Sequence, residues 1–192
     1  HNQCFQCYIS FIVSSNTNIQ NIKNYLKKIC LNFGERTEFQ KNEFHLFPTA
    51  EVLSKTSISD LLKCGLGYRA KYVKKASQDV VNGKIDFEYL KNVDYNTAKT
   101  KLLESFGIGN KVADCILLFS LEKLDSFPLD TWMMKILKKY YFEKIPFDGK
   151  TLTSKRYDEL HEEIVKYFGP YAGYAQQFLF KMERENFQKK WL

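Results

Sequence analysis

The spacing of apolar residues constrains the fold of this chain more than any other feature. From residue 18 onward, Ile19, Ile22, Tyr25, Leu26 and Ile29 fall on one stripe of a helix, and comparable stripes recur along most of the sequence. Short breaks that contain glycine, proline or asparagine separate these segments. No run of alternating apolar and polar residues is long enough to build a sheet. The pattern therefore predicts an all-α fold.

The same periodicity sets the expected boundaries of the helices. Gly34 is expected to end the first helix in the left-handed conformation that glycine adopts readily, and residues 35–47 are expected to form a loop or a small hairpin. Residues 144–149 (KIPFDG) are interpreted as a loop within one domain, since 192 residues suit a single core. Helices are expected over residues 18–33, 57–63, 68–81, 95–105, 110–121, 131–141, 153–168 and 171–184.

The cysteines and the termini bear on the compartment. The five cysteines are odd in number and mostly isolated, which is typical of reduced thiols rather than a disulfide framework. Cys4 and Cys7 form the only CxxC pair, and the three histidines are scattered, so neither a metal site nor a cofactor is expected. The sequence has no stretch of about 18 apolar residues and no secretory signal at its start. We expect an intracellular protein, in the cytoplasm of a prokaryote or the nucleus of a eukaryote.

The net charge favours one class of partner without proving it. Lysine and arginine number 29 against 22 aspartates and glutamates, so the formal charge is +7. Such an excess suits a polyanion such as nucleic acid, although many solvated surfaces carry a similar excess.

Residues 102–119 contain a motif that gives nucleic-acid binding a mechanism. One predicted helix ends, Gly107-Ile108-Gly109 turns, and a second helix begins. The glycines permit a tight turn and a close approach to a ligand, while Ile108 can anchor the hairpin in the core. The free N–H groups and the positive dipole at the start of the second helix can then bind a phosphate. The simpler alternative is that the tripeptide is only a tight interhelical turn.

Two chemical groups flank this hairpin at a fixed spacing. Lys111 lies in the first turn of the second helix, where the helix dipole disfavours a cation and therefore favours the neutral, nucleophilic amine. Asp130 follows Pro128 and Leu129 and precedes an amphipathic helix, so its simplest role is that of an N-cap.

Taken together, residues 107–115 (GIGNKVADC) and 127–130 (FPLD) closely resemble the signature of the 8-oxoguanine DNA glycosylase branch of the helix-hairpin-helix glycosylases. Residues 11–19 (FIVSSNTNI), 65–72 (GLGYRAKY) and 169–176 (GPYAGYAQ) resemble further segments of that family in the same order. The resemblance covers nearly the whole chain. It implies two helical lobes with the active site in the cleft between them.

The resemblance also implies the chemistry. Lys111 would attack C1′ of a flipped nucleotide, expel the damaged base and form a Schiff base, after which elimination nicks the strand. Asp130 would stabilise the positive charge that develops on the sugar, a role compatible with capping a helix. The partner would be double-stranded DNA containing an oxidised purine, bound by a monomer without any membrane association.

Further roles are carried over from matching positions of the family. Cys115 and Phe180 would contact the two faces of the flipped base and Gln176 its edge, although core packing is the alternative for both Cys115 and Phe180. Asn16 would fill the gap in the duplex. Tyr68 would wedge the strand and Arg69 would bind the orphaned cytosine; the alternative is that the two residues only begin a helix.

The sequence departs from the family pattern at two positions. Asn21 stands where a second cytosine-binding arginine is expected, so discrimination for cytosine opposite the lesion is expected to be relaxed. Trp132 replaces an expected histidine; its indole can still stack on or contact the strand, without the pH response of an imidazole.

A third departure concerns the domain content. We expect residues 1–192 to be the helical catalytic region, with the hairpin motif at about residues 96–121, and the β-rich N-terminal domain of the family to be absent. That domain supplies a carbonyl that distinguishes 8-oxoguanine from guanine, so lesion recognition is expected to be incomplete or different in a fragment or natural short form. No iron–sulfur cluster is expected, because no cysteine follows Cys115.

Three functional readings stay open. The first is a glycosylase with lyase activity, favoured because Lys111 and Asp130 are both present. The second is a glycosylase for another lesion, such as an alkylated purine or an adenine mispair, whose known representatives keep the aspartate and lack the lysine. The third is a DNA-binding module or fragment without catalysis.

Overall fold

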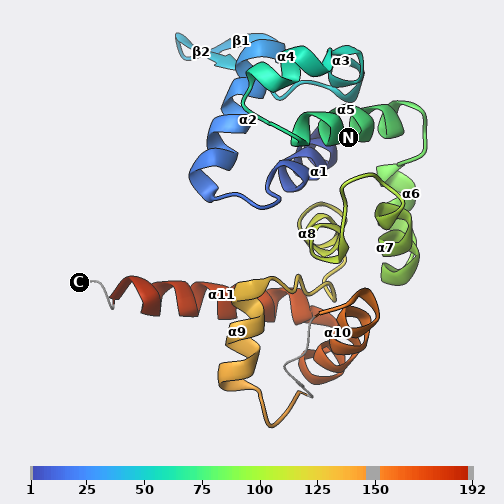
Figure 1. Ribbon diagram of the computed structural model, residues 1–192, viewed down its shortest axis with the longest axis vertical. Helices are drawn as coiled ribbons and strands as arrows, with labels where there is room; N and C mark the ends of the chain where they lie inside the picture. The colour runs from blue at the N-terminus through green and yellow to red at the C-terminus, as the bar shows by residue number, and fades with distance from the viewer. Residues whose placement is uncertain (1, 146–151, 190–192) are drawn as a thin grey trace.

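The computed structural model describes residues 2–145 and 152–189, and it confirms the all-α prediction (Figure 1). A short 3-10 helix, η1 (Gly169–Tyr171), precedes the last α-helix. No described helix is both long and apolar enough to cross a membrane. The α-helices are α1 (Asn2–Val13), α2 (Ile19–Phe33), α3 (Ala50–Lys55), α4 (Ile58–Lys63), α5 (Arg69–Val81), α6 (Phe87–Asn92), α7 (Tyr95–Leu103), α8 (Asn110–Ser120), α9 (Thr131–Tyr140), α10 (Ser154–Phe168) and α11 (Ala172–Lys189).

Where the sequence predicted a helix, the structure has one, with most boundaries agreeing within two residues. The first residue of several predicted ranges caps its helix: Asn18 accepts a hydrogen bond from the amide of Asn21, Ser57 from that of Asp60, and Thr153 from that of Arg156. The helices α1, α3 and α6 were not predicted. Helices α3 and α6 have six residues each and were missed, although α4, which is equally short, was predicted. The last turns of α1 are buried on several sides, which hides an amphipathic stripe.

Residues 35–47 form the hairpin that the sequence left open as one alternative. Strand β1 (Arg36–Phe39) pairs antiparallel with β2 (Asn42–His45). The expectation for Gly34 was wrong, because its φ of −82° and ψ of 149° are extended rather than left-handed. A Cβ at this position would lie 1.9 Å from the carbonyl oxygen of Leu46. Glycine is required here by the close passage of the backbone that leaves β2.

Two separate hydrophobic cores confirm the two expected lobes. The first contains buried residues from α1 to α8, among them Tyr8, Leu53 and Ile116, and the second contains buried residues from Phe127 onward, among them Met133 and Ile164. In Figure 1, α8 lies between the group formed by α1 to α5 and the group formed by α9 to α11. Most of the predicted loop at residues 144–149 lies outside the described residues.

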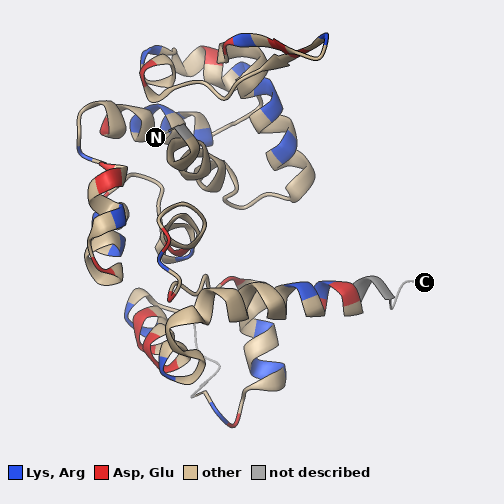
Figure 2. Cartoon of the chain, turned by 180° about the vertical axis from the view of Figure 1, so that it is seen from behind, with Lys and Arg blue, Asp and Glu red and all other residues tan. Residues whose placement is uncertain are grey.

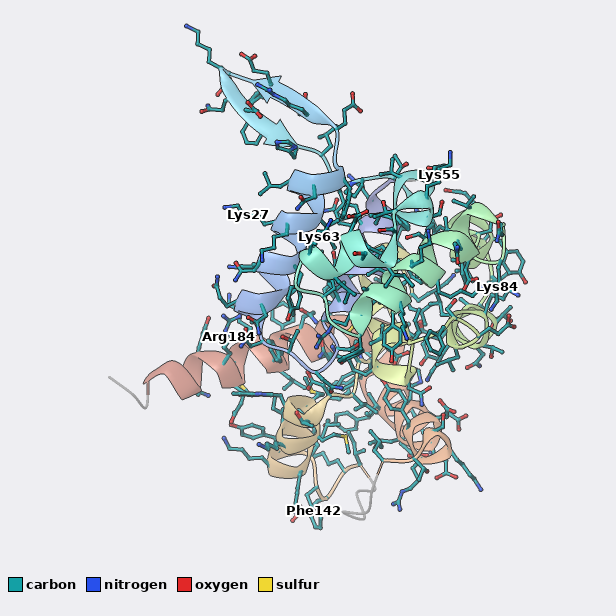
Figure 3. The ribbon with its side chains drawn as sticks, turned by 45° about the horizontal axis from the view of Figure 1, so that its top comes forward. Lys27, Lys55, Lys63, Lys84, Phe142 and Arg184 are labelled. Carbon is teal, nitrogen blue, oxygen red and sulfur yellow. The ribbon has the colours of Figure 1, made fainter. Side chains whose placement is uncertain are left out.

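Basic helices occur in both lobes. Helices α2 and α9 each carry three lysines and no acidic residue, whereas α10 carries four acidic residues beside three basic ones (Figure 2). Figure 3 shows Lys27 on α2 and Lys55 on α3 with their side chains pointing away from the core, and both are exposed. Basic helices that could face a polyanion therefore lie in both lobes.

Candidate active site

The helix-hairpin-helix motif predicted from the sequence is present, with its turn between α7 and α8. Gly107 has a φ of +88°, and Ile108 is buried in the first core, as expected for an anchor. Gly109 begins α8 in an extended conformation without any side-chain cap. The first N–H groups of α8 are therefore available to an acceptor outside the protein, such as a phosphate.

Gly107 offers a test of how much the hairpin depends on glycine. An alanine at this position would have to adopt a left-handed φ, and its Cβ would lie 2.7 Å from the ring of Tyr72. We expect Gly107→Ala to lower the free energy of unfolding by roughly 1–3 kcal/mol and to weaken DNA binding, measured by thermal melting and fluorescence anisotropy. Gly109→Ala is the matched control, because a Cβ there meets no atom within 4 Å. Equal melting temperatures for the two variants would contradict the expectation.

The charges of Lys111 and Asp130 both act on the thiol of Cys115. Cys115 is buried, lies one turn after Lys111 on α8 and belongs to neither core cluster. Burial raises the pKa of its thiol to about 12; the charge and hydrogen bond of Lys111 lower this pKa, and the charges of Asp114 and Asp130 raise it. Lys111 and Asp130 therefore both lie within electrostatic range of one buried side chain, at the junction of the two lobes.

An aromatic ring faces the amine of Lys111. The Nζ atom lies 5.8 Å from the centroid of the Phe11 ring, which in turn stacks on Phe119 with centroids 5.4 Å apart. A ring face attracts an ammonium group and restricts where the side chain points. The sequence analysis did not single out Phe11 for this contact.

Asp130 caps helix α9, as the simpler reading of the sequence predicted. Its Oδ1 atom accepts a hydrogen bond of 2.8 Å from the backbone amide of Met133. The cap orients the carboxylate at the start of the helix and uses one of its two oxygens. Capping and stabilisation of a positive charge are therefore compatible in this geometry.

The residues expected around the flipped base gather beside Asp130. Gln176 is buried, and its Nε2 atom donates to the carbonyl of Pro128 at 3.5 Å, while its Oε1 atom accepts from Gln177. Phe180 meets Trp132 edge to face, with ring centroids 6.4 Å apart. Helix α11 thus brings an amide and an aromatic ring to the segment that carries Asp130.

The residues expected to act on the opposite strand form a second cluster. The guanidinium of Arg69 is buried and donates to the carbonyls of Ser15 and Asn16, and it lies 4.6 Å from the ring centroid of Tyr68. The hydroxyl of Tyr68 donates to Ser15 as well, at 3.3 Å. Asn16 is exposed with a φ of +49°. In this structure Arg69 holds the loop that carries Asn16, and binding a cytosine would require it to release those carbonyls.

The structure also reveals a buried polar group that the sequence analysis missed. Asp114 and Lys99 are almost wholly buried, together with Tyr95, Tyr157 and His161. Charged residues are rarely buried without partners, so an aspartate inside the apolar run VADCILL was a readable signal.

Comparison with known proteins is consistent with this geometry. A family model described as "HhH-GPD superfamily base excision DNA repair protein" matches residues 9–163. Over 95% of its length the chain is 30% identical to a probable N-glycosylase/DNA lyase of Methanothermobacter thermautotrophicus, and over 93% it is 36% identical to N-glycosylase/DNA lyase OGG1 of Arabidopsis thaliana. A crystal structure of Clostridium acetobutylicum 8-oxoguanine glycosylase/lyase, in complex with dsDNA containing cytosine opposite to 8-oxoG, matches 95% of the chain with a TM-score of 0.84 and 34% identity.

These relatives are longer than the chain. The match spans 61% of the Methanothermobacter protein, 49% of the Arabidopsis protein and 60% of the Clostridium chain.

Proposed function

Since the chain belongs to the HhH-GPD superfamily of base excision DNA repair proteins, we propose that it is a DNA glycosylase with lyase activity that excises 8-oxoguanine. The convergence of Lys111 and Asp130 on the buried Cys115, beside a helix start that can bind phosphate, carries the proposal. An amine and a carboxylate at one junction supply the nucleophile and the charge stabilisation that base expulsion requires.

Lys111 is the proposed nucleophile. Its neutral amine forms a bond to C1′ of the flipped nucleotide while the bond from C1′ to the base breaks, and the departing purine takes a proton. Opening of the sugar ring then converts the adduct to a protonated imine. Loss of a proton from C2′ expels the 3′ phosphate and nicks the strand. Asp130 stabilises the positive charge on the sugar during the first of these steps.

The flipped base is proposed to lie between Cys115 and Phe180. A base leaves the stack only if a pocket compensates for the lost stacking and pairing, and these two side chains present a thiol and a ring for that purpose. Gln176 would exchange its 3.5 Å hydrogen bond to Pro128 for one to the edge of the base. Trp132, which is 39% exposed, would contact the strand next to the flipped nucleotide.

The loop of Asn16 and the start of α5 are proposed to act on the undamaged strand. Tyr68 is 48% exposed and stands beside this loop, so its ring can enter the duplex while Asn16 fills the gap. The hairpin of Gly107, Ile108 and Gly109 would bind the backbone of the damaged strand through the N–H groups of α8.

Borohydride trapping tests the proposed function. The wild-type protein is incubated with a duplex containing one 8-oxoguanine opposite cytosine and, separately, with an abasic duplex. Covalent trapping on both supports the proposal. Trapping on the abasic duplex alone would support the lyase activity, but it would show that 8-oxoguanine is not a substrate of this chain. Binding without trapping on either duplex would favour a non-catalytic DNA-binding module.

Asn21 allows a prediction about the opposite base. Its side chain is exposed, and its Nδ2 atom donates to Thr17 at 3.1 Å, so it offers a neutral amide where a relative would offer a guanidinium. We expect excision of 8-oxoguanine opposite all four bases with rates within about tenfold of one another, because one bidentate base contact is worth roughly 1–3 kcal/mol. Asn21→Arg should increase the preference for cytosine. A strong cytosine preference in the wild type would contradict this expectation.

A further inference from the structure

Asp114 is a wholly buried carboxylate on the same helix as Lys111. It follows Lys111 by three residues, so it lies one turn further along α8. Its Oδ1 atom accepts a hydrogen bond of 2.7 Å from the hydroxyl of Tyr95, and its Oδ2 atom accepts one of 2.5 Å from the hydroxyl of Tyr157. A buried carboxylate is costly unless such donors satisfy it, so these contacts are strong constraints on geometry.

Tyr157 extends this contact to the other lobe. Its hydroxyl oxygen also accepts a hydrogen bond of 3.0 Å from the backbone amide of Leu129, the residue that immediately precedes Asp130. A continuous chain therefore runs from the amide of Leu129 through the hydroxyl of Tyr157 to Asp114. One end is next to Asp130 in sequence, and the other is one helical turn from Lys111.

The surroundings keep this chain intact. Burial and the charge of Asp114 raise the pKa of both Tyr95 and Tyr157, so both hydroxyls keep their protons and donate. Lys99 lies 3.9 Å from Asp114, and its Nζ atom donates to Tyr95 and to Asp158. The ring of His161 stacks on Tyr95 with centroids 4.4 Å apart.

The two lobes need such a link because they have separate cores. Lys111 lies on a helix most of whose buried residues belong to the first core, while Leu129 and Met133, which flank Asp130, belong to the second. Apolar packing within each core does not set the orientation of one core relative to the other, since it is not directional. Hydrogen bonds are directional, and those of Tyr157 bridge the two cores.

We propose that Asp114 and Tyr157 are positioning residues that hold the loop of Asp130 at a set distance from the helix of Lys111. The proposal rests on the proposed function. Asp130 contributes most while the base departs and an oxocarbenium-like charge develops on the closed sugar ring, whereas an abasic aldehyde has no base to expel and forms its protonated imine with the charge mainly on nitrogen. Loss of the link therefore impairs base expulsion more than trapping on an abasic site.

The test compares Tyr157→Phe with Tyr95→Phe. Both variants remove one hydroxyl that donates to Asp114, but only Tyr157 binds the amide of Leu129. For each folded variant, the single-turnover rate of 8-oxoguanine excision and the rate of borohydride trapping on an abasic duplex are measured against the wild type. Tyr157→Phe is expected to slow excision about 10- to 100-fold and abasic trapping less than threefold, as expected for misplacement by a fraction of an ångström. Tyr95→Phe is expected to leave the ratio of the two rates unchanged.

Equal losses in the two rates for Tyr157→Phe, or no loss in either, would overturn this inference and leave the proposed function standing. A wild type without either activity would overturn the proposed function and the inference with it. Should Tyr157→Phe fail to fold, Asp114→Asn is the second variant, since it keeps the side-chain volume and one acceptor oxygen. It is expected to shift the ratio of rates in the same direction.

Discussion

Replacing Lys111 by glutamine is expected to abolish covalent trapping on both the 8-oxoguanine duplex and the abasic duplex. The imine requires a primary amine, and glutamine, whose side chain is one atom shorter, ends in an amide nitrogen that is not nucleophilic. We expect the rate of strand nicking to fall at least about 10³-fold, the scale seen when a catalytic nucleophile is removed. Single-turnover nicking and trapping with borohydride measure the two effects.

Lys101→Gln is the control for the loss of a positive charge close to the hairpin. Lys101 lies on α7 and pairs with Glu104 at the surface, with 36% of its side chain exposed. We expect this variant to trap normally and to bind DNA slightly more weakly. Trapping that persists in Lys111→Gln would show that another amine forms the imine, and would remove the main support for the proposed mechanism.

Replacing Asp130 by asparagine is expected to separate its two roles. Asparagine caps helices about as well as aspartate, so the hydrogen bond to Met133 and the melting temperature should be retained. The negative charge is lost, and with it the stabilisation of the positive sugar. We expect the rate of 8-oxoguanine excision to fall about 10²- to 10³-fold, comparable to removal of one preorganised electrostatic contact.

Asp130→Ala completes the comparison. Alanine cannot cap α9, so this variant should lose about 1 kcal/mol of stability in addition to the excision rate. Thermal melting and single-turnover excision, measured on both variants, distinguish the roles. If Asp130→Asn kept full activity, the carboxylate would be a helix cap only and the proposed electrostatic role would be wrong.

The cysteine in this site is expected to act as a neutral group at physiological pH. Burial raises its thiol pKa to about 12 even though Lys111 lies close enough to lower it. A thiolate at Cys115 would compete for the positive charge that Asp130 is proposed to stabilise. The raised pKa therefore suits a residue that packs against a base and takes no part in proton transfer.

Much of the fold could be predicted because it depends on local patterns. The apolar stripe of α2 is visible in the sequence. Three predicted ranges begin at Asn18, Ser57 and Thr153, the residues that cap α2, α4 and α10. The hairpin at Gly107 was readable for the same reason, since a left-handed φ and a buried anchor between two glycines are properties of a few neighbouring residues. The short helices α3 and α6 were missed, although their caps, Thr49 and Asp86, could have been read as helix starts in the same way as Ser57 of the equally short α4.

In the candidate site, too, some features could be predicted from local sequence and others depend on distant contacts. Local patterns in the sequence were enough to place the two proposed catalytic residues, Lys111 in the first turn of one helix and Asp130 at the start of another, because capping and periodicity act over a few residues. The tertiary structure was needed to show that Asp130 approaches Cys115, that Arg69 binds the loop of Asn16, and that Tyr157 joins Leu129 to Asp114. These contacts connect residues 15 to 54 positions apart. Such contacts depend on how two separately packed cores are oriented, which no local pattern encodes.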